Sequence, residues 1–234
     1  MTLDAPPTPT PFSVALREAT WAKHEGVDPS SSSTTEPVDE GPGILGALLD
    51  GDLHLDDYAA LTAQQYFIYQ VLDEAAQRWR DHPLAGRFVF DELSRTAAFD
   101  ADLSVLVGPQ WRDSIRPIAS TARYVARLRQ VCLDWPGGFV AHHYTRFLGD
   151  LSGGQAFRSA INDAYGFADG PGVRFYVFDA IDDITDFKNR YRAELDAAGW
   201  SQDERRRIID EVLTAYDYNG SILSELGTMM RRSV

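Results

Sequence analysis

Three glycines in an otherwise helix-like stretch could create a chemical site. In HHYTRFLGDLSGGQAF, residues 142–157, apolar residues recur at near-helical spacing, but Gly149, Gly153 and Gly154 interrupt them. Each interior glycine weakens a helix by about 1 kcal/mol relative to alanine. Gly149 and Gly153 are four residues apart, so they leave one helix face bare. Such a face serves either tight helix packing, a break between two helices, or a pocket wall for a planar ligand.

Polar residues near this stretch would suit such a pocket. Asp150 lies between the glycines, either as a solvated helix carboxylate or as a polar group beside a bare wall. Tyr144 offers a hydroxyl on the same helix, and Lys188 and Arg192 are four residues apart, so they point the same way. Singly, each is most simply a surface residue. Together with Arg17, they suit a planar apolar ligand that carries two carboxylates.

His24 is the candidate metal ligand. Its simplest interpretation is a surface histidine favoured by the dipole at the end of the first predicted helix. A single imidazole is nevertheless sufficient when iron arrives with four ligands of its own, as in haem. Arg17 precedes it by two helical turns on the same face, and Asp28, four residues later, could orient the ring.

Other cofactor motifs are missing from the sequence. No Asp or Glu stands three residues before any histidine, as a di-iron bundle would require, and one cysteine cannot build a zinc motif. Neither a P-loop nor a dinucleotide-binding glycine motif is present, so we expect no intrinsic flavin or NAD site.

Composition narrows the class further. The formal net charge of −13 argues against nucleic acid and anionic membranes as partners, although it leaves room for a local basic pocket. No apolar run is long enough for a membrane span, and the N-terminus lacks the features of a secretory signal. Cys132, alone, fits a reducing cytoplasm and is expected to be a small buried residue. We therefore expect a cytoplasmic protein.

The chain is predicted to be nearly all helix, in a single bundle. No internal repeat or linker divides it. Ser201 and Glu204 form a capping box, and Ile208, Val212, Ala215 and Ile222 mark one face of the last helix, with Gly227 as its stop. The period of VRFYVF, residues 173–178, does not decide between strand and helix. Helices are expected near residues 11–24, 44–49, 56–80, 84–95, 101–108, 117–135, 139–166, 183–199 and 202–227.

The run HHYTRFLGDLSGGQ closely resembles the signature of the haem oxygenase family, of the biliverdin-producing, soluble bacterial type. LREATWAKHEGVD is similar to that family's proximal-histidine helix, and YFIYQVLDEA and FKNRYRAELD are similar to two further segments in the right order. The resemblance covers roughly residues 12–227. It implies an all-α, single-domain helical bundle with haem between a proximal and a distal helix.

Carried over position by position, the resemblance assigns a role to each candidate residue. His24 would be the axial iron ligand, and Gly149 and Gly153 would place backbone against the distal face of haem. Asp150 would hold a distal water network. Its outer members would be Tyr69 and Arg146, and the propionates would meet Arg17, Tyr144, Lys188 and Arg192. Arg17 stands where many members have Lys, and Asp28 where Glu is common.

The implied activity is oxidative opening of haem to biliverdin, CO and ferrous iron. Haem would be both cofactor and substrate, O₂ the oxidant, and a ferredoxin or a flavin/NADPH reductase the external electron donor. Two alternatives remain at this point: a haem-binding or trafficking protein on the same fold without turnover, and a helical-bundle enzyme that binds no haem.

The expected domain boundaries follow from the same patterns. Residues 1–11 are predicted to be a disordered leader, residues 12–227 the domain, and residues 228–234 a tail. The polar segment 29–43 is predicted to be a flexible loop insertion, longer than the family usually has after the proximal helix.

Overall fold

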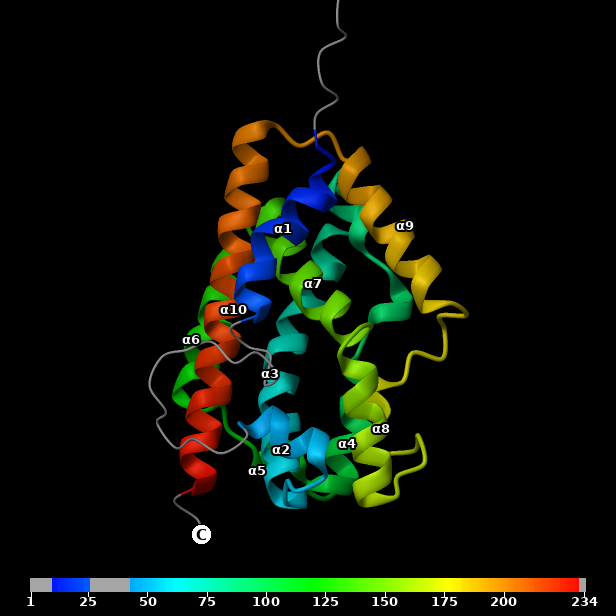
Figure 1. The fold of residues 1–234 in the computed structure, drawn as a ribbon, viewed down its shortest axis with the longest axis vertical. Coiled ribbons are helices and arrows are strands. Elements are labelled where there is room, and N and C mark those ends of the chain that lie inside the picture. Colours follow the sequence, from blue (N-terminus) through cyan, green and yellow to red (C-terminus); the bar gives the residue numbers. More distant parts are fainter. Residues whose placement is uncertain (1–9, 26–42, 232–234) are drawn as a thin grey trace, which may run out of the picture.

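The computed structural model describes residues 10–25 and 43–231, with the backbone alone for residues 22–25. This part of the chain contains helices and no strand, which confirms the predicted all-α class (Figure 1). The predicted leader and the 29–43 loop lie almost wholly outside the described residues. The α-helices are α1 (Phe12–Glu25), α2 (Ile44–Asp50), α3 (Leu55–Trp79), α4 (Thr96–Leu106), α5 (Trp111–Ser114), α6 (Ala119–Cys132), α7 (Pro136–Asp150), α8 (Gly154–Tyr165), α9 (Ile184–Ala197) and α10 (Gln202–Arg231).

The last helix shows how packing overrides a local signal. The backbone N–H of Glu204 donates to Ser201 Oγ at 3.2 Å, as the capping box predicts, and the four residues of the predicted apolar face are buried. The predicted stop at Gly227 is wrong, because α10 continues to Arg231. Buried Leu226 and partly buried Met230 pack on the core on either side of that glycine. Gly51, Gly166 and Gly199, which do follow helix ends, all have positive φ.

The predicted helix over residues 84–95 is also wrong. The chain forms two short 3₁₀ helices there, η1 (Ala85–Phe88) and η2 (Asp91–Leu93). The Arg95 guanidinium accounts for part of this break, because it donates to the carbonyls of Glu92, Leu93 and Ser94. α4 then begins at Thr96, where the Asp73 carboxylate of α3 accepts from the backbone N–H of Arg95 and Thr96.

The segment whose period was undecided, residues 173–178, is a single 3₁₀ turn, η3 (Arg174–Tyr176), followed by extended backbone. Asp102, a fully buried carboxylate on α4, holds it. Its oxygens accept from the backbone N–H of Gly172, Arg174 and Phe175 at 2.7–2.8 Å. Arg95 holds the other side of the segment through the carbonyls of Phe175 and Val177.

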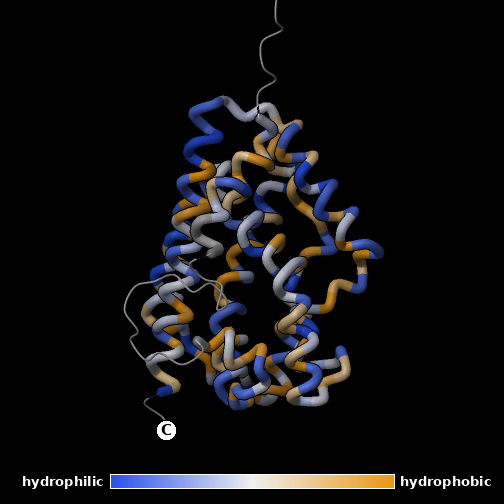
Figure 2. The backbone as a smooth tube through the Cα atoms, in the orientation of Figure 1, coloured by the Kyte–Doolittle hydropathy of each residue, from blue (hydrophilic) through white to orange (hydrophobic). Residues whose placement is uncertain are grey.

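The core lies between the long helices. α3 and α7 run through the centre, with α10 and α6 on one side and α8 and α9 on the other (Figure 1). Hydropathy follows this arrangement: the solvent-facing first turns of α10 are strongly hydrophilic (Figure 2). α1, the first helix, packs against the last two, α9 and α10. The Ser13 N–H and hydroxyl donate to Asp196 of α9 at 2.8 and 2.9 Å.

Candidate active site

The glycine stretch forms a break between two helices. α7 ends at Asp150 and α8 begins at Gly154, with a turn at residues 151–153. A Cβ built on Gly149 would meet nothing within 4 Å, and one on Gly153 would meet only the Gly149 carbonyl oxygen, at 4.0 Å. Gly154 instead packs against Tyr176, 3.2 Å from its would-be Cβ. The stretch is therefore both a helix break and a wall left bare at Gly149 and Gly153.

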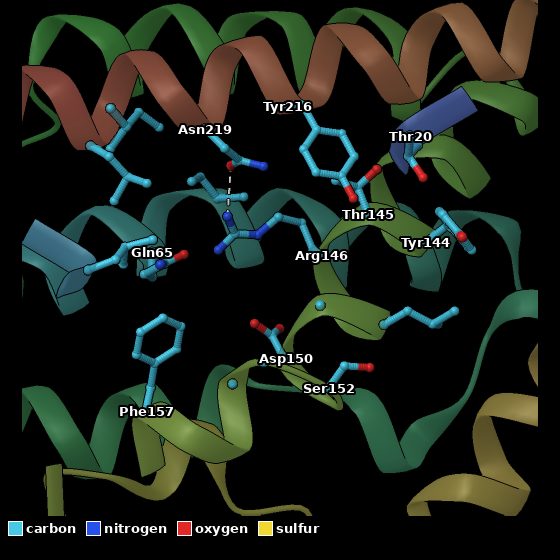
Figure 3. A pocket seen from close by; sticks show the side chains of 18 of the residues that line it. Thr20, Gln65, Tyr144, Thr145, Arg146, Asp150, Ser152, Phe157, Tyr216 and Asn219 are labelled. Atoms are coloured by element: carbon cyan, nitrogen blue, oxygen red, sulfur yellow. Dashed lines mark hydrogen bonds between the residues drawn. The ribbon is translucent and has the colours of Figure 1, made fainter. Parts of the chain in front are cut away.

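This wall borders a cavity of about 530 Å³, within the roughly 300–1,000 Å³ typical of small-molecule sites. Residues of α1, α2, α3, α7, α8, α9 and α10 line it (Figure 3). Much of the lining is apolar, including Leu61, Ile68, Leu148, Phe157, Ile222 and Leu223. The cavity therefore offers a planar apolar ligand a backbone surface on one side and hydrocarbon around it.

A chain of polar side chains runs along the same wall. The Tyr69 hydroxyl, from α3, donates to the Asp150 carboxylate. Arg146 Nε donates to the Tyr69 hydroxyl oxygen at 3.3 Å, and Arg146 Nη1 donates to Asn219 Oδ1 of α10 at 2.7 Å. Three of these residues line the cavity, whereas Tyr69 lies behind them in the core. The predicted catalytic residues Asp150, Arg146 and Tyr69 therefore lie next to one another, beside the bare wall at Gly149 and Gly153.

Burial sets the charge states in this chain. It raises the pKa of Asp150 from 3.8 to about 6, although Arg146, Tyr69 and Arg95 all act to lower it. Burial also raises the pKa of Tyr69 well above its usual value, so its hydroxyl stays protonated and can donate. Burial alone would lower the pKa of Arg146, but Tyr69 and Asp150 outweigh it and raise that pKa. A permanent cation and a carboxyl that titrates near neutral pH therefore lie side by side.

The predicted basic residues gather at one rim of the cavity. Arg17 of α1, Tyr144 of α7 and Arg192 of α9 line it. Burial raises the pKa of Tyr144, while Arg192 and Arg17 act to lower it, which indicates that both guanidinium groups are near the phenol. Lys188 lies just beside the lining, with Nζ 3.1 Å from the hydroxyl of Ser152, which does line the cavity. Two helices far apart in sequence, α1 and α9, thus supply the cations of one rim, and α7 adds the Tyr144 hydroxyl.

The proximal side is only partly described. The backbone of His24 lies in the last turn of α1, but the side chain of His24 and all of Asp28 lie outside the described residues. Thr20 and Trp21 precede His24 by four and three residues and line the cavity. Trp21 is 61% exposed, so it stands at the cavity mouth.

Several lining residues escaped the sequence interpretation. Asn219 and Tyr216 lie on the inner face of α10, and Tyr216 hydrogen-bonds with Thr20 of α1. Asn219 could have been found, because it continues the predicted apolar face at residues 215 and 222 with a polar side chain. Gln65, Phe157 and Tyr176 gave no such signal, because only the tertiary fold brings them to the wall.

His142, His143 and Cys132 are buried in the core and do not line this cavity. His142 contacts Glu211 and Tyr124 at 2.9 and 3.0 Å. His143 is buried, which lowers its pKa to about 3. Cys132 is buried, as predicted. Across residues 10–25 and 43–231, no three His, Cys, Asp or Glu side chains form a metal site, and no helix has the length and apolar character needed to cross a membrane.

Comparison with known proteins agrees with this geometry. The family model described as "Heme oxygenase" matches residues 10–225. Heme oxygenase 1 of Synechocystis sp. is 36% identical over 187 residues, covering 80% of this chain and 78% of the relative. Heme oxygenase of Porphyra purpurea is 34% identical over 213 residues, covering 91% of this chain and 85% of the relative.

Solved structures agree as well. The crystal structure of heme oxygenase-1 from Synechocystis in complex with heme has a TM-score of 0.84 at 32% identity, covering 96% of each chain. Heme oxygenase from Leptospira interrogans has a TM-score of 0.81 at 29% identity, covering 92% of this chain and 100% of the other. The fold and the site define a helical haem-binding enzyme. This chain belongs to the haem oxygenase family.

Proposed function

We propose that this haem oxygenase binds haem in the cavity between α1 and the α7–α8 break and opens the ring to biliverdin, releasing CO and ferrous iron. Haem is then both cofactor and substrate, O₂ is the oxidant, and a ferredoxin or a flavin/NADPH reductase supplies the electrons. The observation that carries the proposal is the bare wall at Gly149 and Gly153, with a titratable carboxyl at its edge.

The residues present fit haem. A planar apolar ring needs a flat surface without side chains, and a Cβ at Gly149 would project into open space. Two propionates need donors at one edge, and Arg17, Tyr144 and Arg192 line one rim, with Lys188 beside it. For the axial ligand we propose His24, since Arg17, Thr20 and Trp21 line the cavity and position 24 follows them at i+7, i+4 and i+3.

Haem supplies the iron that binds O₂, and the chain's own residues control water and protons around it. Asp150 extends from the wall toward the cavity (Figure 3). Above a pH of about 6 its carboxylate accepts hydrogen bonds from water on the distal side. Tyr69 fixes one carboxylate oxygen, and Arg146, held by Asn219, fixes Tyr69. In this proposal, Asp150 passes protons through that water to the distal side.

A haem carrier without turnover, the alternative considered from sequence, is not favoured. The relatives that match 80% and 91% of the chain are named heme oxygenases.

A haemin titration followed by ascorbate under air tests the proposal. We expect a one-to-one complex with a haem absorption band, and its conversion to a bile-pigment spectrum after reductant is added. A complex that stays intact would contradict turnover. The variant His24→Ala should shift the spectrum of the complex, and an unshifted spectrum would show that another residue ligates the iron.

A further inference from the structure

Gln65 of α3 is a polar side chain in an unusual position. It lines the cavity, and its carbonyl oxygen Oε1 is buried with no hydrogen-bond partner among the described residues. A buried acceptor without a donor destabilises the folded state, so such groups are rare in native proteins. The position therefore indicates that a donor comes from inside the cavity.

The preceding residue provides the contrast. Gln64 also lines the cavity, but both polar atoms of its amide have partners in the segment between α5 and α6. Its Nε2 donates to the Arg116 carbonyl at 3.3 Å, and its Oε1 accepts from the Ile118 N–H at 3.0 Å. Two adjacent glutamines thus share a cavity, and one of them has its acceptor unpaired.

An unsaturated donor borders the same cavity. The guanidinium of Arg146 has five N–H groups. Among the described residues, it donates one to Tyr69 and one to Asn219. Its side chain extends from α7 toward the side of the cavity where Gln65 lies (Figure 3). No direct hydrogen bond joins Gln65 and Arg146 among the described residues.

We propose that a water molecule in the cavity accepts a hydrogen bond from the Arg146 guanidinium and donates one to Gln65 Oε1. A buried water usually has two to four polar partners, and these two groups supply the first two. Gln65 is then a positioning residue. It fixes the guanidinium that orients Tyr69, which in turn orients Asp150. This consequence for turnover rests on the proposed function, whereas the water bridge itself does not.

Unfolding of the haem-free protein tests the bridge independently of catalysis. If water satisfies Gln65, Gln65→Leu removes a bridged contact, and Tm stays unchanged or falls by about 1–3 °C. If the acceptor is truly unpaired, the same variant removes a penalty, and Tm rises by about 2–6 °C, which would overturn the proposal. Gln64→Leu calibrates the measurement, since it strips partners from Arg116 and Ile118 and should lower Tm clearly.

A crystal structure of the haem-free protein supplies the second measurement. We expect a water within hydrogen-bond distance of both Gln65 Oε1 and Arg146. A site without that water, or a direct bond between the two side chains, would refute the bridge even if haem turnover is normal.

Turnover then tests the positioning role. Gln65→Leu should lower kcat by about three- to tenfold and leave the haem Kd within twofold. Gln65→Glu keeps an acceptor at this position and should restore most of the lost rate. A Leu variant that turns over like the wild type would contradict the positioning role, and so would a Glu variant no better than Leu.

Discussion

The Asp150 carboxyl is held where its ionised form is disfavoured. Its pKa in the folded chain, about 6, lies above its ordinary 3.8, so the folded state binds this proton more tightly than the unfolded state does. The resulting cost to stability is absent below about pH 4, grows between pH 4 and 6, and is complete above pH 6. Burial in a polar cavity wall is its cause, and catalytic groups commonly carry such a cost.

Replacing this carboxyl by an amide should therefore stabilise the protein while removing its activity. We expect Asp150→Asn to raise the free energy of unfolding by about 3 kcal/mol at pH 7.5 and by only about 1 kcal/mol at pH 4.5, because the folded and unfolded pKa values differ by about two units. Urea unfolding at the two pH values measures this. The variant should still bind haemin but lose ring opening, and equal turnover in the two proteins would remove Asp150 from the mechanism.

A substitution at Gly149 tests whether haem lies against the bare wall. A methyl group at this position meets no atom within 4 Å, so Gly149→Ala should stabilise α7 by about 0.5–1 kcal/mol. Because the methyl would stand where the ring lies, we expect haemin to bind at least tenfold more weakly. Gly220→Ala is the matched control: it also meets nothing within 4 Å, in α10, and is not part of the cavity lining. Haemin affinity that is unaltered in Gly149→Ala would mean that the ring lies elsewhere.

At the scale of elements, α4 positions the site without touching it. Asp102 and Arg95 hold the segment 172–177 through its backbone. This segment carries Tyr176 against Gly154, where α8 begins. Gln155 of α8 adds a link, because its Nε2 donates to the carbonyls of Asp150 and Tyr176, both at 3.2 Å. The geometry of the helix break thus depends on a helix behind it.

Removing the Asp102 carboxylate should be costly. Asp102→Ala leaves two buried backbone N–H groups and one partly buried one without their acceptor, and we expect the free energy of unfolding to fall by about 3 kcal/mol. Asp134→Ala is the surface comparison, since its ion pair with Arg78 is exposed and should contribute less than about 1 kcal/mol. Chemical denaturation of both variants measures the difference, and similar losses would show that Asp102 does not hold the segment.

Sequence patterns predicted the long helices better than the residues at which they begin and end. The predicted apolar face of α10 was correct because burial repeats at helical spacing along that helix. The predicted stop at Gly227 was wrong because the core contacts of neighbouring residues outweigh the effect of one glycine. The predicted helix at residues 84–95 was wrong in part because the Arg95 side chain donates to several backbone carbonyls there. At the site, the resemblance assigned Asp150, Arg146 and Arg192 to one pocket, and they do lie around one cavity. The role proposed for Gln65 could not be predicted from the sequence, because it depends on the absence of a hydrogen-bond donor to its Oε1 among the described residues.

At the scale of the whole molecule, charge is distributed unevenly. The chain has a net charge of −13, yet Arg17, Arg192 and Lys188 gather where a dianionic edge would lie. Long-range repulsion of an anionic ligand must therefore be overcome locally by short-range donors.

This arrangement predicts that one arginine acts on carboxylates alone. Arg192→Ala should raise the Kd for haemin about tenfold and leave the Kd for haemin dimethyl ester unchanged, because the ester has no anionic oxygens. Arg190→Ala is the control on the same helix, since Arg190 packs on Phe90 and Phe187 instead of lining the cavity. Equal losses for haemin and its ester would assign Arg192 a packing role. Absorption titrations of the wild type and both variants with each ligand measure the six dissociation constants.

The packing of α1 against α9 and α10 has a consequence for how the chain folds during synthesis. This helix is translated before the two helices it packs against, α9 and α10. The hydrogen bonds from Ser13 to Asp196 join residues that are 183 positions apart in the sequence. A nascent polypeptide consequently lacks one side of the cavity until α10 has been made, so the cavity cannot form before then.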